Sequence, residues 1–225
     1  MIYFRNDYSE GAHPSILSAL AATNLEATPG YGRDQYCEAA QDAVRRRFAC
    51  PDAEVHFMLG GTITNLTLIA AALRPWEAVI AAETAHICVH ESGSVEATGH
   101  KICTVPTADG KLTADDIRRV VQSHLDGDDG HMALPRLVYL SDATELGTVY
   151  TNAELTAISA VCRELGLLLY LDGARMGAAL VCKDNDLQPE DFARLCDAFY
   201  IGGTKNGLLF GEALVLVNDA LKSHF

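Results

Sequence analysis

The chain has 225 residues, and its 17 basic and 30 acidic side chains give a formal net charge of −13 at pH 7. Nucleic acids and anionic membranes attract basic surfaces, so this charge argues against both as partners and favours a small-molecule ligand. No apolar run approaches the roughly 18 to 20 residues that cross a bilayer, no signal segment follows Met1, and the seven cysteines form no CxxC pair, so we expect a soluble cytoplasmic protein.

The first fifty residues are predicted to be mainly helical. Residues 10–24 read as a helix after an irregular start, and within 28–48 a Gly/Pro-rich turn leads into a second helix. We expect these residues to form an N-terminal segment, 1–50, that precedes a larger α/β unit covering 51–225.

From residue 51 onward, short β-rich runs alternate with amphipathic stretches of helical length. The expected helices cover 64–74, 113–125, 152–166 and 188–196, with Thr113 and Asp116 as a capping box, Asn152 at a start and Gly166 at an end. This alternation predicts a three-layer α/β/α fold with a mainly parallel sheet, which binds ligands at the carboxyl ends of its strands. The expected strands are 54–59, 78–83, 101–106, 136–142, 167–173, 198–203 and 212–218.

Gly60, Gly61 and Thr62 follow the first strand and precede a helix. Two glycines, a hydroxyl and a helix N-terminus suit an anion such as phosphate, although strand-to-helix geometry alone can also require a Gly-Gly turn. The segment has neither the lysine of a Walker loop nor the GxGxxG spacing of a dinucleotide site. A nicotinamide-binding Rossmann protein is therefore disfavoured.

Three other strand ends carry polar residues. Asp172 follows five apolar residues and needs a cationic partner, either Arg175 or a cofactor nitrogen. His86 follows another strand and is either a structural histidine or an imidazole that stacks on a flat ring. Lys205 lies in the turn GGTKNG, either as a surface lysine or as a neutral nucleophile. Asp172, His86 and Lys205 match the ring nitrogen, the ring face and the aldehyde of pyridoxal 5'-phosphate, and the turn at 60–62 matches its phosphate.

The segments YLDGARMG, FYIGGTKNGLLFGEALV and ETAHICVHESG resemble those of the low-specificity threonine aldolases. These enzymes belong to the β-eliminating lyase branch of the fold-type-I pyridoxal-phosphate enzymes, and the similarity extends from FRNDYSEGAHP through essentially the whole chain. The resemblance implies retro-aldol cleavage of threonine or allo-threonine to glycine and an aldehyde. It also implies the cofactor contacts: Lys205 as the Schiff-base lysine, Asp172 beside the pyridine nitrogen, His86 on the ring, and Gly60, Gly61, Thr62 and His90 near the phosphate.

The same resemblance assigns residues to the substrate. Arg175 matches an arginine near the cofactor phenol oxygen and the substrate carboxylate, and Asn6 stands where many relatives have a carboxylate-binding serine. His131 falls where aldolases carry a second histidine beside the substrate hydroxyl. His86 and His131 are thus the expected bases, because imidazole titrates near neutral pH.

The resemblance further implies that segment 1–50 contributes to the site, that 51–225 is the cofactor-binding large domain, and that a C-terminal small domain is absent. A homodimer or homotetramer is expected, and no metal. Two alternatives stay open: another reaction on the same cofactor, β-elimination or transamination, and a catalytically incompetent fragment or binding protein on this scaffold. The sequence does not show which bond at Cα lies perpendicular to the ring.

Overall fold

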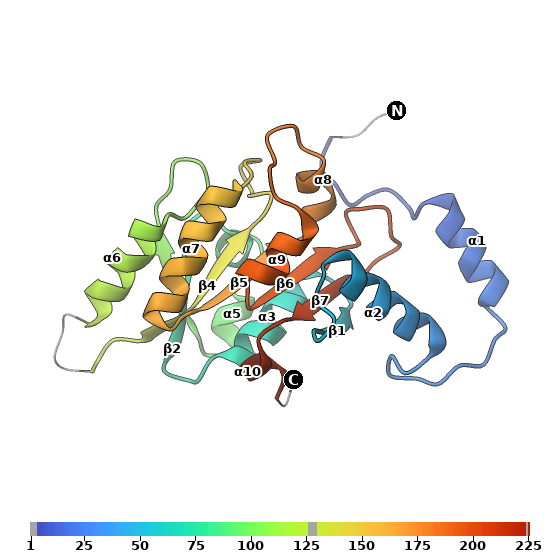
Figure 1. Ribbon diagram of the computed structural model, residues 1–225, viewed down its shortest axis with the longest axis horizontal. Coiled ribbons are helices and arrows are strands. Elements are labelled where there is room, and N and C mark those ends of the chain that lie inside the picture. Colours follow the sequence, from blue (N-terminus) through green and yellow to red (C-terminus); the bar gives the residue numbers. More distant parts are fainter. Residues whose placement is uncertain (1–3, 126–129, 224) are drawn as a thin grey trace.

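Seven short apolar segments form one sheet, which lies between two layers of helices in the computed structural model (Figure 1). The structure describes residues 4–125, 130–223 and 225. The strand order is β1-β7-β6-β5-β4-β2-β3, and only β7 runs antiparallel to its neighbours. The strands are β1 (Glu54–Met58), β2 (Glu77–Ala82), β3 (Lys101–Val105), β4 (Leu134–Ser141), β5 (Leu168–Gly173), β6 (Ala198–Gly202) and β7 (Glu212–Leu216).

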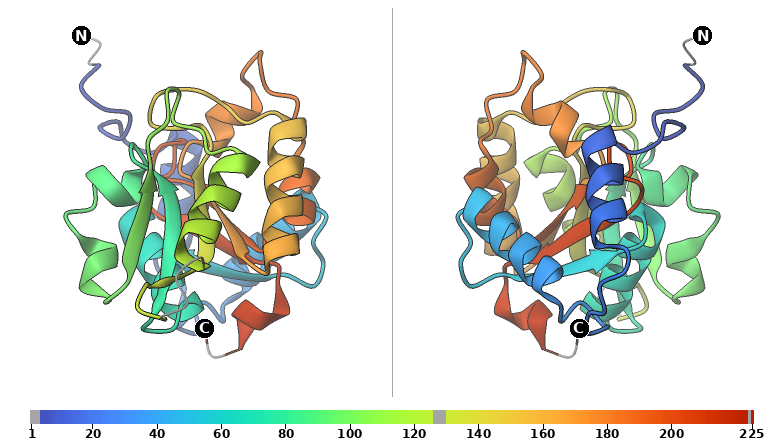
Figure 2. Two further views of the ribbon diagram at one scale, coloured as in Figure 1. Left: turned by 90° about the vertical axis from the view of Figure 1, so that its left-hand side faces the viewer. Right: turned by 90° about the vertical axis from the view of Figure 1, so that its right-hand side faces the viewer.

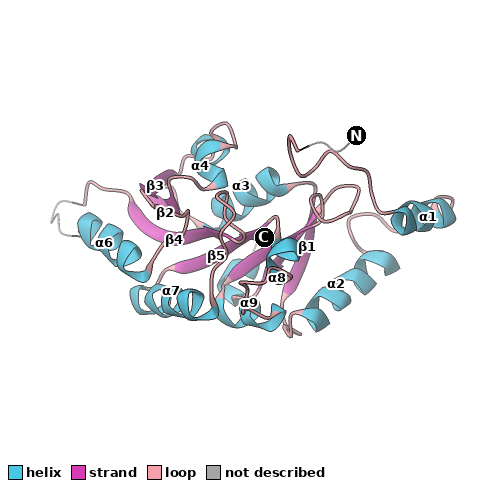
Figure 3. Cartoon of the chain, turned by 90° about the horizontal axis from the view of Figure 1, so that it is seen from above, coloured by secondary structure: helices cyan, strands magenta, loops and turns pink. Residues whose placement is uncertain are grey.

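The helices cover both faces of the sheet, as Figure 3 shows from above, with α3 and α4 on one face and α6, α7 and α9 on the other. The first two helices lie at the end of the sheet where β1 and β7 pair (Figure 2, right). No helix in the described part of the chain is long and apolar enough to cross a bilayer. The helices are α1 (Pro14–Thr23), α2 (Gln35–Arg47), α3 (Gly61–Ala72), α4 (His86–Val89), α5 (Ser94–Ala97), α6 (Ala114–Leu125), α7 (Asn152–Leu165), α8 (Met176–Leu180), α9 (Pro189–Leu195) and α10 (Asp219–Lys222).

The register of the central strands brings their carboxyl ends into one row. Ser141 of β4 pairs with Asp172 of β5, which in turn pairs with Tyr200 of β6. Every residue of β5 is buried, as expected for a strand covered on both faces. The rings of Tyr139, Tyr170 and Tyr200 lie side by side across these strands, with centroids 5.8 Å and 6.4 Å apart, and form the floor below the strand ends.

The predicted strands, the mainly parallel sheet and the capping box of Thr113 and Asp116 are confirmed. Gly166 ends α7 in the left-handed conformation, with φ of 66°. α7 begins at Asn152, as predicted. Thr151 is the cap, because its side chain accepts from the backbone N–H of Glu154 while the Glu154 carboxylate accepts from the backbone N–H of Thr151.

Candidate functional site

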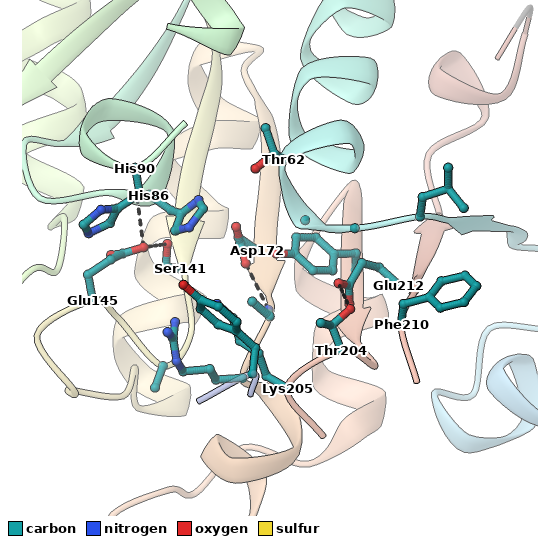
Figure 4. A pocket seen from close by; sticks show the side chains of 18 residues that line it. Thr62, His86, His90, Ser141, Glu145, Asp172, Thr204, Lys205, Phe210 and Glu212 are labelled. Atoms are coloured by element: carbon teal, nitrogen blue, oxygen red, sulfur yellow. Dashed lines mark hydrogen bonds between the residues drawn. The ribbon is translucent and has the colours of Figure 1, made fainter. Parts of the chain in front are cut away.

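A pocket with a cavity volume of about 350 Å³ opens at the carboxyl ends of the strands. Side chains from β5, from the loops after β1, β2, β4 and β6, and from the N-terminal segment line it. In Figure 4, His86, His90 and Glu145 lie on one side and Thr204, Phe210 and Glu212 on the other, with Asp172 between them. Eight of the ten site residues expected from the sequence line this pocket: Gly60, Gly61, Thr62, His86, His90, Asp172, Arg175 and Lys205.

The turn from β1 into α3 forms one wall of the pocket. Gly60 precedes α3 without a side-chain cap, so the first backbone N–H groups of a 12-residue helix are available to an anion. Gly61 is required by close packing, because a Cβ on it would lie 2.9 Å from the hydroxyl oxygen of the buried Tyr200. Thr62 adds an exposed hydroxyl at the same helix start.

Asp172 is only 3 % exposed, and its carboxylate accepts three hydrogen bonds. Oδ1 accepts from the backbone N–H of Ala174 at 2.9 Å. Oδ2 accepts from Asn65 Nδ2 at 3.0 Å and from the Tyr139 hydroxyl at 2.5 Å. Among the described residues, no lysine or arginine forms an ion pair with this carboxylate. A buried anion that faces a pocket without such a partner is suited to a positively charged ligand group.

The arginine expected as a partner of Asp172 makes a different contact. Arg175 donates from Nε and Nη2 to the carboxylate of Asp7, at 2.5 Å and 3.1 Å. This ion pair uses one edge of the planar guanidinium and leaves its other N–H donors available. Arg175 lines the pocket and is thus in a position to bind an anionic group there.

His86 lies at the start of α4, and its Nδ1 is 2.8 Å from Oε1 of Glu91. The Glu91 side chain is fully buried, and this hydrogen bond raises the pKa of the His86 imidazole above its ordinary value, against an opposing effect of burial. Because Nδ1 is occupied, Nε2 is the nitrogen left for a ligand. The His90 ring lies beside that of His86, with centroids 5.5 Å apart.

Lys205 lies in the loop between β6 and β7, on the pocket wall that faces the N-terminal segment. Glu212 fixes the start of this loop, because its carboxylate accepts from the Gly203 N–H at 2.7 Å and from the Thr204 hydroxyl at 2.8 Å. The Lys205 Nζ lies 6.0 Å from the centre of the Tyr8 ring, which also lines the pocket. The ammonium group is therefore placed at the cavity by a turn whose start is held by Glu212.

The structure also contributes pocket residues that the sequence analysis missed, above all Glu145. Its Oε1 accepts from the Ser141 hydroxyl at 2.7 Å and from the backbone N–H of His86 at 2.9 Å. Burial raises the pKa of the Glu145 carboxyl. The available signal was its place shortly after the predicted strand 136–142, where polar residues gather at the edge of the sheet.

Two expected site residues, Asn6 and His131, do not line this pocket. Oδ1 of Asn6 instead accepts from the Tyr8 N–H at 3.1 Å and from the Ser9 hydroxyl at 2.7 Å, which makes it a turn residue. His131 is exposed and precedes β4, at its amino end, whereas the pocket lies at the carboxyl end. At about 3.3 Å per residue, the eight residues of β4 separate the two ends by roughly 23 Å. His131 thus lies away from this pocket in the single chain, and its role as a second base stays a prediction.

Comparisons with known proteins agree with this geometry. Residues 4–224 match the model of the family described as beta-eliminating lyase. The chain is 39 % identical to a low-specificity L-threonine aldolase of Pseudomonas aeruginosa and 37 % identical to one of a Pseudomonas species, in both cases over 99 % of this chain and 64 % of the relative. The chain therefore spans slightly less than two thirds of the length of these curated relatives.

A solved structure of Leishmania major threonine aldolase superposes with a TM-score of 0.94 at 52 % identity, covering 97 % of this chain and 63 % of that one. Enzymes of this family and fold use pyridoxal phosphate. The family match spans nearly the whole chain, and the strand-end residues lie where a ligand of an α/β sheet binds. The chain belongs to the beta-eliminating lyases, within the fold-type-I pyridoxal-phosphate enzymes.

Proposed function

We propose that the protein is a pyridoxal-phosphate-dependent aldehyde-lyase that cleaves β-hydroxy-α-amino acids such as threonine or allo-threonine to glycine and an aldehyde. The observation that carries this proposal is the buried Asp172 carboxylate, which faces the same pocket as the Lys205 amine and the N-terminus of α3. These three groups correspond to three separate parts of one cofactor. The matched relatives named threonine aldolase supply the reaction class.

The groups that line the pocket fit pyridoxal phosphate. Asp172 would hold the proton on the ring nitrogen, because it is a buried carboxylate without a lysine or arginine ion-pair partner among the described residues. The backbone N–H groups at Gly61 and Thr62 would hold the phosphate. The amine of Lys205 would bind covalently to the aldehyde carbon of the cofactor. When bound, the cofactor supplies an electron-accepting ring that stabilises negative charge developing at the substrate Cα.

The residues of the chain would bind the substrate and move its proton. Arg175 would bind the substrate carboxylate through the guanidinium donors that Asp7 leaves available. Nε2 of His86 would accept the proton of the β-hydroxyl as the Cα–Cβ bond breaks and the β-carbon becomes the aldehyde. Glu91 assists this transfer, because its carboxylate stabilises the imidazolium that forms.

The experiment that tests the proposal is a product assay. The purified chain is incubated with pyridoxal phosphate and either threonine or allo-threonine, and acetaldehyde, glycine, ammonia and 2-oxobutyrate are measured. We expect acetaldehyde and glycine in equal amounts, a loss of both with Lys205→Ala, and no loss with Lys183→Ala, an exposed lysine that serves as the matched control.

Other outcomes point to the alternatives. Ammonia with 2-oxobutyrate indicates β-elimination, and conversion of the added cofactor to its amine form indicates transamination. A protein that binds the cofactor and releases none of these products supports a binding role, which would overturn the proposed activity.

The wider setting of the enzyme is also a proposal. The division into a 1–50 segment that contributes to the site and a 51–225 cofactor-binding domain is supported by Tyr8, which lines the pocket from the N-terminal segment. We also propose that the enzyme is a cytoplasmic homodimer or homotetramer. The net charge of −13 supports the proposal that nucleic acids and anionic membranes are not its partners. Light scattering of the purified protein tests the oligomeric part, and a monomer would contradict it.

A further inference from the structure

One fully buried amide connects the carboxylates of Glu91 and Asp172. Asn65 lies in the second turn of α3 with no exposed surface. Its Nδ2 donates to Oε1 of Glu91 at 2.7 Å and to Oδ2 of Asp172 at 3.0 Å. Its Oδ1 accepts from the Tyr170 hydroxyl at 2.8 Å. The two carboxylates thus approach each other within two hydrogen-bond lengths, with the amide between them.

The chemistry of the partners fixes the direction of this amide. An ionised carboxylate has no hydrogen to donate, so only the NH₂ group of Asn65 satisfies both Glu91 and Asp172. The Tyr170 hydroxyl supplies a donor to the carbonyl side. Both hydrogens and the oxygen of Asn65 therefore have partners, and the reverse orientation would place an oxygen against two carboxylates.

We propose that Asn65 is a positioning residue that keeps Glu91 and Asp172 ionised and oriented at the same time, so that each can hold a separate proton. Glu91 then holds the proton of His86, and Asp172 holds the proton of a cofactor ring nitrogen. The second part rests on the proposed function, whereas the first part rests on contacts within the chain alone.

Loss of the amide would leave the Glu91 and Asp172 carboxylates facing each other without the shared N–H donor between them. Like charges at this separation disfavour each other's ionised form, so the pair would take up a proton. Either protonation removes negative charge near His86 and lowers the pKa of its imidazole, which the hydrogen bond to Glu91 now raises. The other charged and titratable groups near the His86 ring or main chain are Asp172, Lys205, His90 and Glu145.

The experiment is a pH titration of the His86 ring by NMR on the full chain, with Asn65→Leu as the variant. We expect the unaltered protein to titrate above an exposed histidine, which lies at about 6.5, and Asn65→Leu to titrate lower. Turnover of the cofactor-loaded variant should fall at least about tenfold. Tyr170→Phe is the matched control, because it removes the contact to Oδ1 and leaves both N–H donors in place; its His86 titration should stay unchanged.

An unchanged His86 titration in folded Asn65→Leu would overturn the proposal. If that variant does not fold, the unaltered protein offers a second measurement: both side-chain amide hydrogens of Asn65 should exchange slowly with D₂O, and one that exchanges at the rate of an exposed amide would equally overturn it. Failure of the proposed function would appear separately, as the absence of cofactor at Lys205, and would leave the His86 titration unaffected.

Discussion

Replacing Asp172 with asparagine tests whether this carboxylate holds the proton on the ring nitrogen of the cofactor. The replacement also removes one buried hydrogen bond. In the native protein, Oδ1 accepts from the Ala174 N–H and Oδ2 accepts from Asn65 and from the Tyr139 hydroxyl. An asparagine has only one acceptor oxygen, so in either orientation its NH₂ faces an N–H donor. The Tyr139 hydroxyl can rotate to become an acceptor, whereas the N–H groups of Ala174 and Asn65 can only donate.

The expected loss of stability follows from this unpaired N–H donor. A buried donor without an acceptor costs about 1 to 3 kcal/mol of the free energy of unfolding, and for a chain of this size each kcal/mol lowers the midpoint of thermal unfolding by about 2 to 4 °C. A hydrogen bond to a charged group contributes about 1.5 to 3 kcal/mol. If the bond from Asp172 to the ring nitrogen acts in the transition state, its loss slows turnover by about 10- to 150-fold.

The assay pairs thermal unfolding followed by circular dichroism with aldehyde release from threonine, at equal cofactor occupancy. Asp184→Asn is the matched control, because Asp184 is exposed, and it should change neither quantity. If Asp172→Asn folds, binds the cofactor and turns over at the native rate, Asp172 is a structural residue and the proposed role is wrong.

Three further changes have defined outcomes. Because Glu91 raises the pKa of His86, a rate that needs neutral His86 rises with pH, and Glu91→Gln should move that rise to lower pH; an unmoved profile would exclude His86 as the base. Gly61→Ala places a Cβ against a buried hydroxyl and should weaken cofactor binding by about tenfold, whereas Gly30→Ala lies outside the pocket, meets no described protein atom within 4 Å and should not; equal affinities would show that Gly61 is not required by packing. His131→Asn should leave aldehyde release unchanged, because His131 lies away from the pocket of its own chain; a large loss would instead support the second-base role expected from the sequence.

Much of the fold could be predicted because local pattern and burial agree along the sheet. The β5 run LLYLDG is apolar up to Asp172, as a strand covered on both faces must be, and its polar end marks the edge where ligands bind. The short helices α4, α5, α8 and α10 have only four or five residues each, so no helical period could reveal them. Thr151 was missed as a cap although the Thr-x-x-Glu spacing of Thr151 and Glu154 is a capping-box signature present in the sequence.

Only part of the candidate site could be predicted, because local pattern reveals strand ends but not contacts between distant segments. Residues at or shortly after the ends of strands, such as Asp172 and Lys205, could be predicted from their positions in the chain. Asn65 lies inside a helix with an apolar pattern, and nothing in its spacing links it to Glu91, 26 residues later. The ion pair between Asp7 and Arg175 joins residues 168 positions apart. Such contacts depend on the three-dimensional packing of distant segments.

The most direct test of the account is to find where the cofactor is attached. The protein is incubated with pyridoxal phosphate, reduced with borohydride, digested and analysed by mass spectrometry. We expect a phosphopyridoxyl group on Lys205, accompanied by loss of the absorption band of the bound cofactor, and no such group in Lys205→Ala. A reduced group carried mainly by another lysine, such as the exposed Lys183, would contradict the assignment of this pocket as the cofactor site.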